Sequence, residues 1–150
     1  MALGGFAREA RRRSALRAWD DVSRILRRVR ICALDHVQLA MPAGGEAEAR
    51  AFYCGVLGLA EVAKPPHLAA RGGCWFESEG VRIHLGVERE FRPATKAHPA
   101  LRVSGLAELL ERCRKGGYAV VDDEPLAGYR RAYLADPFGN RIEVMEPSAA

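Results

Sequence analysis

Four side chains in this chain are suited to binding a divalent metal ion, namely His36, His84, His98 and Glu143. Three imidazoles and one carboxylate suit Fe(II), Ni, Co, Zn or Mn, and four protein ligands leave two octahedral positions for water or a bidentate substrate. His84 and Glu143 occupy matching places in two similar stretches, which begin at Gly80 and Gly139, 59 residues apart (139 − 80). The chain therefore contains an internal repeat that presents a candidate ligand in each copy.

The repeat extends through most of the chain. Gly58 matches Gly117 at the same offset, Trp75 matches Leu134, and the stretch that opens with His36 aligns with the one that opens with His98. This predicts two modules, 32–90 and 95–147. Each module supplies one histidine from its first strand and one His or Glu from its last.

Hydrophobic periodicity predicts the same order of elements in both modules. In the first we expect a strand at 32–41, a helix at 46–57 and strands at 59–63, 73–78 and 81–87. In the second we expect a strand at 98–103, a helix at 105–115 and strands at 118–122, 129–135 and 140–146. The predicted fold is α+β: two tandem βαβββ modules forming a curved mixed sheet around a metal and substrate cavity, with an extra N-terminal helix.

Alternation along the strands places the four ligands on the face opposite the apolar one. In 81–87, for example, Ile83 and Leu85 point to one face and His84 to the other. That second face is polar and mostly basic, so it either lines a cavity or faces solvent. The arginines there favour an anionic substrate, or they are rim residues paired with acids. Trp75 and Leu134 are expected in the core, and the candidate substrate-binding residues are Gln38, Phe76, Arg82, Arg102, Arg131, Tyr133 and Arg141.

The net charge of +4 is unevenly distributed. Residues 1–30 carry nine Arg and three acids (+6), whereas the other 120 residues carry 14 Lys and Arg against 16 Asp and Glu (−2). The basic character belongs to an N-terminal arm, which argues against a nucleic-acid groove in the main domain. The four scattered cysteines indicate reduced thiols in the cytoplasm, and no apolar run approaches the ~20 residues of a membrane span.

The predicted organisation is a basic helical arm at 1–31, a single domain at 32–147 and a tail at 148–150. Leu16, Trp19, Val22 and Leu26 recur at helical spacing in the arm. The arm is interpreted first as a helix packed on the domain or on a dimer partner, then as a frayed extension, then as a membrane- or nucleic-acid-binding helix.

The main domain resembles the vicinal oxygen chelate superfamily, which includes glyoxalase I, methylmalonyl-CoA epimerase, extradiol dioxygenases and the fosfomycin and bleomycin resistance proteins. The resemblance covers 32–147 and is carried by Leu34-Asp35-His36-Val37, Ala51-Phe52-Tyr53 through Leu59, His98-Pro99-Ala100-Leu101 and Asp136-Pro137-Phe138-Gly139-Asn140-Arg141-Ile142-Glu143. It implies a divalent metal held by His36, His84, His98 and Glu143, with Glu143 as a catalytic proton carrier. His84 departs from the family, because glyoxalase I typically has Glu there and the epimerase Gln.

The resemblance implies three functions. The first is a glyoxalase-like lyase or isomerase acting on a small oxygenated, anionic substrate. The alternatives are a metal-free binding protein of the bleomycin-resistance kind and an Fe(II) extradiol-type dioxygenase. A homodimer that binds a small molecule is expected, without nucleic-acid or membrane partners.

Overall fold

The computed structural model describes residues 29–124 and 126–148. The chain divides into two units, Met1–Leu34 and Asp35–Ala150. Residues 1–28 of the predicted basic helical arm (1–31) lie outside the described residues. All of the site residues predicted from the sequence belong to the second unit, and no helix in the described part is long and apolar enough to cross a membrane.

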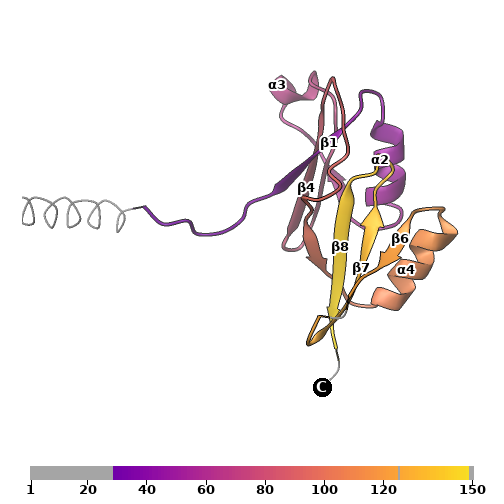
Figure 1. The fold of residues 1–150 in the computed structure, drawn as a ribbon. Coiled ribbons are helices and arrows are strands. Elements are labelled where there is room, and N and C mark those ends of the chain that lie inside the picture. The colour runs from indigo at the N-terminus through magenta and orange to yellow at the C-terminus, as the bar shows by residue number, and fades with distance from the viewer. Residues whose placement is uncertain (1–28, 125, 149–150) are drawn as a thin grey trace, which may run out of the picture. The chain divides into compact units, whose positions relative to one another are not determined.

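The second unit contains the two expected modules (Figure 1). The first consists of β1 (Val37–Met41), α2 (Glu46–Tyr53), β2 (Ala60–Val62), α3 (Pro66–Ala69), β3 (Trp75–Ser78) and β4 (Val81–Val87). The second consists of β5 (Ala100–Arg102), α4 (Leu106–Lys115), β6 (Val120–Asp122), β7 (Tyr129–Ala135) and β8 (Arg141–Pro147). The short helix α3 was not predicted, and α2 ends four residues before the expected end of its helix.

Each module forms its own four-stranded mixed sheet, with the orders β1-β4-β3-β2 and β5-β8-β7-β6. The first and last strands of each module pair in parallel, so that Gln38 lies opposite His84 and Ala100 lies opposite Glu143. The α+β fold with tandem βαβββ modules is therefore confirmed. Its consequence for function is that the two candidate ligands on last strands, His84 and Glu143, occupy equivalent central positions.

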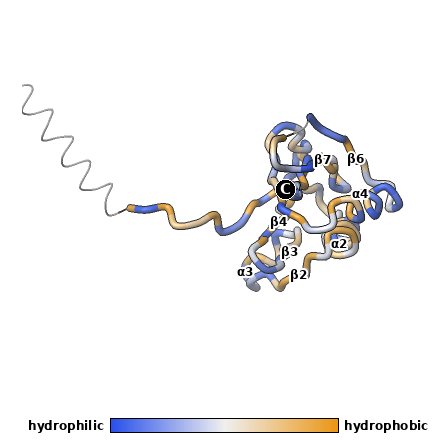
Figure 2. The backbone as a smooth tube through the Cα atoms, turned by 90° about the horizontal axis from the view of Figure 1, so that it is seen from below, coloured by the Kyte–Doolittle hydropathy of each residue, from blue (hydrophilic) through white to orange (hydrophobic). Residues whose placement is uncertain are grey.

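The strand alternation seen in the sequence produces one continuous core. Ile83 and Leu85 of β4 and Ile142 and Val144 of β8 are at most 1% exposed. α2 and α4 lie on the same side of the sheets in Figure 1, and end-on in Figure 2 they lie beside each other between the two groups of strands. The Arg112 guanidinium joins these helical regions by donating to the carbonyl of Val56 at 3.0 Å.

A buried polar network fastens the two modules together at the turn before β8. The Asp136 carboxylate accepts hydrogen bonds from the Tyr53 hydroxyl (2.9 Å) and from the Asn140 side chain (2.9 Å). The Asn140 amide also donates to the carbonyl of Ala40 at the far end of the sequence (2.8 Å) and accepts from the backbone N–H of Ala94 (2.9 Å). Tyr53 and Asn140 are fully buried. Their polar groups cannot reach water, so these hydrogen bonds within the protein satisfy them instead.

One strand has the opposite phase from the one predicted. Antiparallel pairing places Trp75 opposite His84 and Phe76 opposite Ile83, so Trp75 shares the ligand face and Phe76 lies in the core. In the second module it is Tyr133 that lies opposite Glu143. Trp75 therefore matches Tyr133 at an offset of 58 (133 − 75), because the second module's turn is one residue longer. The prediction applied a constant offset of 59, which displaced this strand by one residue and so assigned its side chains to the wrong faces.

Candidate metal and substrate site

The first half of the candidate site is an aromatic stack on β4. The His84 ring lies between the Trp75 ring, with centroids 4.1 Å apart, and the His36 ring, with centroids 4.2 Å apart. Only 7% of His84 is exposed, and its Nε2 atom is buried without a hydrogen-bond partner among the described residues. Burial and then the neighbouring His36 imidazole lower the pKa of His84, which keeps the ring neutral and a nitrogen lone pair available.

His36 is held from its other side by a carboxylate. It lies immediately before β1, and its Nδ1 is 2.8 Å from the Asp35 carboxylate. The pKa of Asp35 is lowered by this hydrogen bond and then by the charge of Arg82, whose guanidinium donates to Asp35 at 2.7 Å. With Nδ1 engaged by an acceptor, Nε2 is the atom of His36 left to bind a ligand or a metal.

The second half of the candidate site is formed by His98 and Glu143. His98 Nδ1 lies 2.8 Å from the carbonyl of Lys96, an acceptor that fixes the proton on Nδ1 of the neutral ring. His98 Nε2 then lies 3.3 Å from Glu143 Oε2. The Glu143 side chain is only 10% exposed. When the His98 ring is neutral, its Nε2 and Glu143 Oε2 both present lone pairs. The two atoms thus face the same small space, one from the residues before β5 and the other from β8.

The other Glu143 oxygen belongs to an ionic network on β7. The Arg131 guanidinium donates to Glu143 Oε1 at 2.8 Å and pairs with the Asp123 carboxylate at 2.6 Å. The hydrogen bond to Glu143 holds the pKa of Arg131 above its usual range. Tyr133 packs edge-on against His98, and the Arg141 guanidinium lies 4.7 Å from the Tyr133 ring centroid. Arg131, Tyr133 and Arg141 therefore gather around Glu143.

The four candidate ligands form two pairs in the chain, His36 with His84 and His98 with Glu143. Within the described part of the chain, no group of three or more His, Cys, Asp or Glu side chains is placed to hold one metal ion. Each pair lies on the face of its sheet opposite the core.

The remaining candidate residues are distributed unevenly. Gln38 is exposed on β1 beside Gly86. Arg82 pairs with acids at the edge of the sheet, as the rim interpretation expects, and Arg102 is exposed on β5. Phe76 does not line the site: it is fully buried and its ring stacks on that of Tyr53.

The donor atoms present fit a divalent metal. Metal-binding histidines usually donate their second ring N–H to a carboxylate or a backbone carbonyl, and His36 and His98 each show that arrangement. His84 contributes a buried Nε2 with no protein partner, and Glu143 contributes Oε2. Imidazole nitrogens with one carboxylate oxygen match the preference of borderline first-row ions.

Several residues at the site escaped the sequence interpretation. Asp35 is adjacent to His36, so its proximity was a usable signal. The positions of Asp123 and of the Lys96 carbonyl depend on loop conformation, for which hydrophobic periodicity holds no information. Trp75 was missed because of the phase error in β3.

The matched family model is that of the Glyoxalase/Bleomycin resistance protein/Dioxygenase superfamily, over residues 33–144. The chain belongs to this superfamily. A search of curated protein sequences finds no match.

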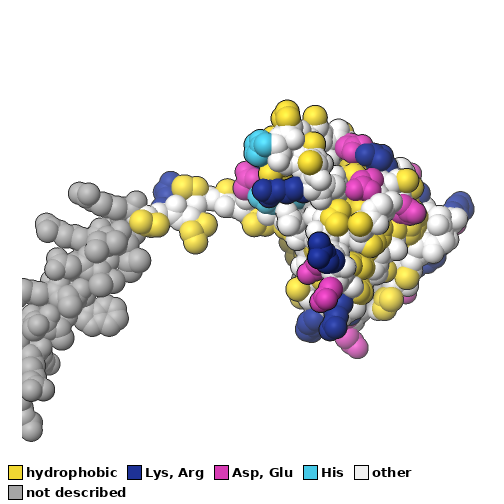
Figure 3. Space-filling view, turned by 90° about the horizontal axis from the view of Figure 1, so that it is seen from above, with side chains coloured by type: hydrophobic (Ala, Val, Ile, Leu, Met, Phe, Trp, Pro, Cys, Tyr) yellow, Lys and Arg dark blue, Asp and Glu magenta, His cyan; other side chains and the backbone are white. Residues whose placement is uncertain are grey.

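On the face of the molecule shown in Figure 3, basic and acidic side chains are interspersed, without a broad area of one sign.

Several solved structures are similar to the chain in fold. A glyoxalase family protein from Bacillus anthracis is 48% identical, with a TM-score of 0.76, over 80% of this chain and 98% of the other. The fosfomycin resistance protein FosX from Listeria monocytogenes, complexed with Mn(II) and sulfate, is 18% identical, with a TM-score of 0.65, over 79% and 93%. TnmS3, an antibiotic-binding protein from Streptomyces sp. CB03234, is 24% identical, with a TM-score of 0.57, over 79% and 100%. The latter two similarities concern the fold alone.

Proposed function

We propose that this protein is a metal-dependent lyase or isomerase of the glyoxalase type, acting on a small oxygenated, anionic substrate. His36, His84 and His98 would hold a divalent ion through Nε2, and Glu143 would hold it through Oε2. The observation that carries the proposal is the shared state of these donors: two histidines have Nδ1 committed to an acceptor, and the third has a buried Nε2 without a partner. A bound ion would supply charge that stabilises an enediolate developing on two adjacent substrate oxygens.

The chain's own residues would divide the remaining work. Glu143 is the proton carrier: Arg131 occupies Oε1, so Oε2 would take the substrate proton only when it is not bound to the ion. Arg131 is committed to Glu143 and Asp123, so Arg141, whose guanidinium lies over the Tyr133 ring, is the cation that would favour an anionic substrate. In the strand register Trp75 lies opposite His84, and Tyr133 lies opposite Glu143. The two aromatic rings would shield these ligands from water.

We further infer that two copies of the chain complete each site. Each chain presents two separate ligand pairs, and the modules that carry them have the same parallel strand pairing. A second copy related by a two-fold axis can therefore place its second module against the first module of this chain. The isologous contact would create two identical sites, each with His36 and His84 from one copy and His98 and Glu143 from the other.

Metal binding provides the test and requires no known substrate. The purified protein, stripped with EDTA and reloaded with Mn(II) or Co(II), is expected to bind one ion per chain. His84→Ala and Glu143→Ala should each lower the affinity at least tenfold, and Glu48→Ala, an exposed carboxylate on α2, should not. Unchanged metal content in both site variants would remove the metalloenzyme proposal.

Mixing two inactive variants tests the shared site. If sites form between chains, a His36→Ala chain paired with a Glu143→Ala chain has one site with both defects and one intact site. High-affinity metal binding should then return on mixing, at up to one ion per mixed dimer. If each site lies within one chain, no mixture restores it.

A metal-free binding protein is the second candidate. It is favoured by the Arg131 guanidinium, which already neutralises Glu143 at 2.8 Å without any ion. Such a protein should bind ligand equally well with and without EDTA. Oxygen uptake with catechols in the Fe(II)-loaded protein would instead support a dioxygenase.

A further inference from the structure

A cavity of about 250 Å³ lies on the ligand face of the first module. Its floor is made by Gln38 of β1, Trp75 of β3 and Gly86 of β4, and its wall is the loop that carries α3. Typical ligand pockets span about 300–1,000 Å³, so this one suits only a small molecule. It adjoins the candidate metal site, because Trp75 is stacked on His84 and Gln38 is paired with His84 in the strand register.

Both charged side chains that line this cavity are cationic. They are Lys64, half-buried before α3, and Arg71, exposed after it. The Lys64 ammonium donates to the carbonyl of Gly72, which anchors its position. Two cations that line one cavity from a single loop form a recognition element for an oxyanion group.

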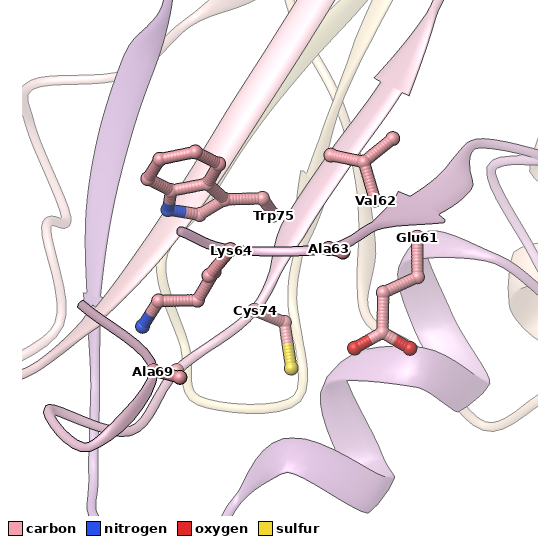
Figure 4. A pocket seen from close by; sticks show the side chains of 8 residues that line it. Glu61, Val62, Ala63, Lys64, Ala69, Cys74 and Trp75 are labelled. Atoms are coloured by element: carbon pink, nitrogen blue, oxygen red, sulfur yellow. The ribbon is translucent and has the colours of Figure 1, made fainter. Parts of the chain in front are cut away.

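Two acids lie near this loop, and each already accepts hydrogen bonds from the protein. The neighbouring cavity of about 410 Å³ shares Lys64 and Trp75 and is also lined by Glu61. In Figure 4 the Lys64 and Trp75 side chains lie on one side of this cavity and the Glu61 carboxylate lies toward the helix. There Glu61 accepts two hydrogen bonds from Arg50, at 2.7 and 3.0 Å. Glu46 accepts the N–H of Gly73 at 2.9 Å and does not line the cavity under α3.

The rest of the lining is apolar. Leu68 and Val87 line the cavity together with Trp75. One face of the Trp75 ring is covered by His84, so its remaining surface is available to the cavity. The chemistry required of an occupant is therefore a compact apolar body with one anionic group.

We propose that the cavity beneath α3 is the anion subsite of the substrate, taking a small organic acid whose carboxylate lies at Lys64 and Arg71 and whose apolar body lies on Trp75. The inference rests on the proposed function for its orientation, since it directs the other end of the acid toward His84. Binding of the acid itself requires no metal. Failure of the subsite can therefore be distinguished from failure of the metal site.

Trp75 fluorescence provides the test. The chain has two tryptophans, Trp19 and Trp75, so a Trp19→Phe background leaves Trp75 as the sole reporter. Metal-free protein is titrated with cyclohexanecarboxylate and, in parallel, with its neutral amide. We expect a saturable change with the acid and at least tenfold weaker binding of the amide.

Substitutions then assign the anion contact. Arg71→Gln and Lys64→Gln should each weaken binding of the acid about tenfold and leave the amide unaffected, whereas Arg114→Gln, at an exposed arginine of α4, should change neither. Thermal melts of all variants check folding, and Arg71 is exposed, so its loss does not disturb the core. Equal binding of acid and amide, absence of a saturable response to the acid, or equal loss in Arg114→Gln would overturn the proposal.

Discussion

The two modules share one order of elements and one pattern of strand pairing, but their polar faces differ in kind. In the first module the central ligand position is an aromatic stack of Trp75, His84 and His36. In the second the equivalent position is an ionic network in which Glu143 is bound by Arg131. The first face leaves a buried nitrogen without a partner, and the second binds one oxygen of its carboxylate from within the chain and leaves the other facing His98 Nε2.

The difference indicates a division of roles between the copies of the repeat. An unpartnered buried polar atom costs stability and persists when function requires it. The first module therefore presents the coordinating atom that no protein group occupies. The second module holds an anion in a defined orientation and limits it to one free oxygen. A site that combines one face of each kind has both a pre-oriented carboxylate and a vacant nitrogen donor.

The largest expected effect concerns the turns that precede the two ligand strands. The second module's turn contains the buried network, whereas the first module's turn contains only the exposed Glu79 and Gly80. Asn140→Ala should lower the free energy of unfolding by roughly 3 kcal/mol, because it removes the hydrogen bonds to the part-buried Ala40 carbonyl and Ala94 N–H and one of those to the buried Asp136 carboxylate. Urea titration measures this change.

Two matched variants calibrate that loss. Glu79→Ala, in the equivalent turn, should stay within about 0.5 kcal/mol of the unmodified protein. Tyr53→Phe removes a single bond to Asp136 and should cost about 1 kcal/mol. An Asn140→Ala protein as stable as Glu79→Ala would show that the network does not fasten the modules.

The same comparison explains what the sequence could predict. The βαβββ order and the faces of β4 and β8 follow from local alternation of apolar residues, and those predictions held. The phase of β3 failed because it was inferred from a constant repeat offset, which a single extra residue in the later turn disrupts. The pairing of the four ligands two by two, and the cavity under α3, depend on how strands and loops meet in space. Periodicity along the chain does not encode either feature.

The next prediction concerns stability, which should change with opposite signs at the two equivalent ligand positions, His84 and Glu143. His84→Phe keeps the ring stack and removes the unpartnered Nε2, so it should stabilise the metal-free protein by about 1 kcal/mol. Glu143→Leu removes the partner of the Arg131 guanidinium and should lower the urea midpoint. Both measurements are made in EDTA. Shifts of the same sign would mean that the two faces do not differ as their contacts indicate.

The smallest expected effect is the acid sensitivity of each module. Glu46 accepts the N–H of Gly73 at 2.9 Å in the first module, and Glu146 accepts the N–H of Gly105 at 2.6 Å in the second. These hydrogen bonds are the largest cause that lowers the pKa of each carboxylate from the ordinary value of 4.5. A lowered folded-state pKa means that the stabilisation is fully present above pH 4.5 and is lost as the pH falls through the folded value.

Glu46→Gln and Glu146→Gln should therefore each reduce the urea midpoint at pH 7 and converge on the unmodified protein as the pH falls below 4.5 through the folded-state pKa. Glu48→Gln should track the unmodified protein throughout. Salt separates the modules further. Glu146 also pairs with the exposed Arg130, so its contribution should shrink as NaCl is raised, because mobile ions screen exposed charges. The main partner of Glu46 is a backbone N–H, and its contribution should change less. Equal salt dependence in the two variants would show that the Arg130 pair adds nothing to the backbone bond of Glu146.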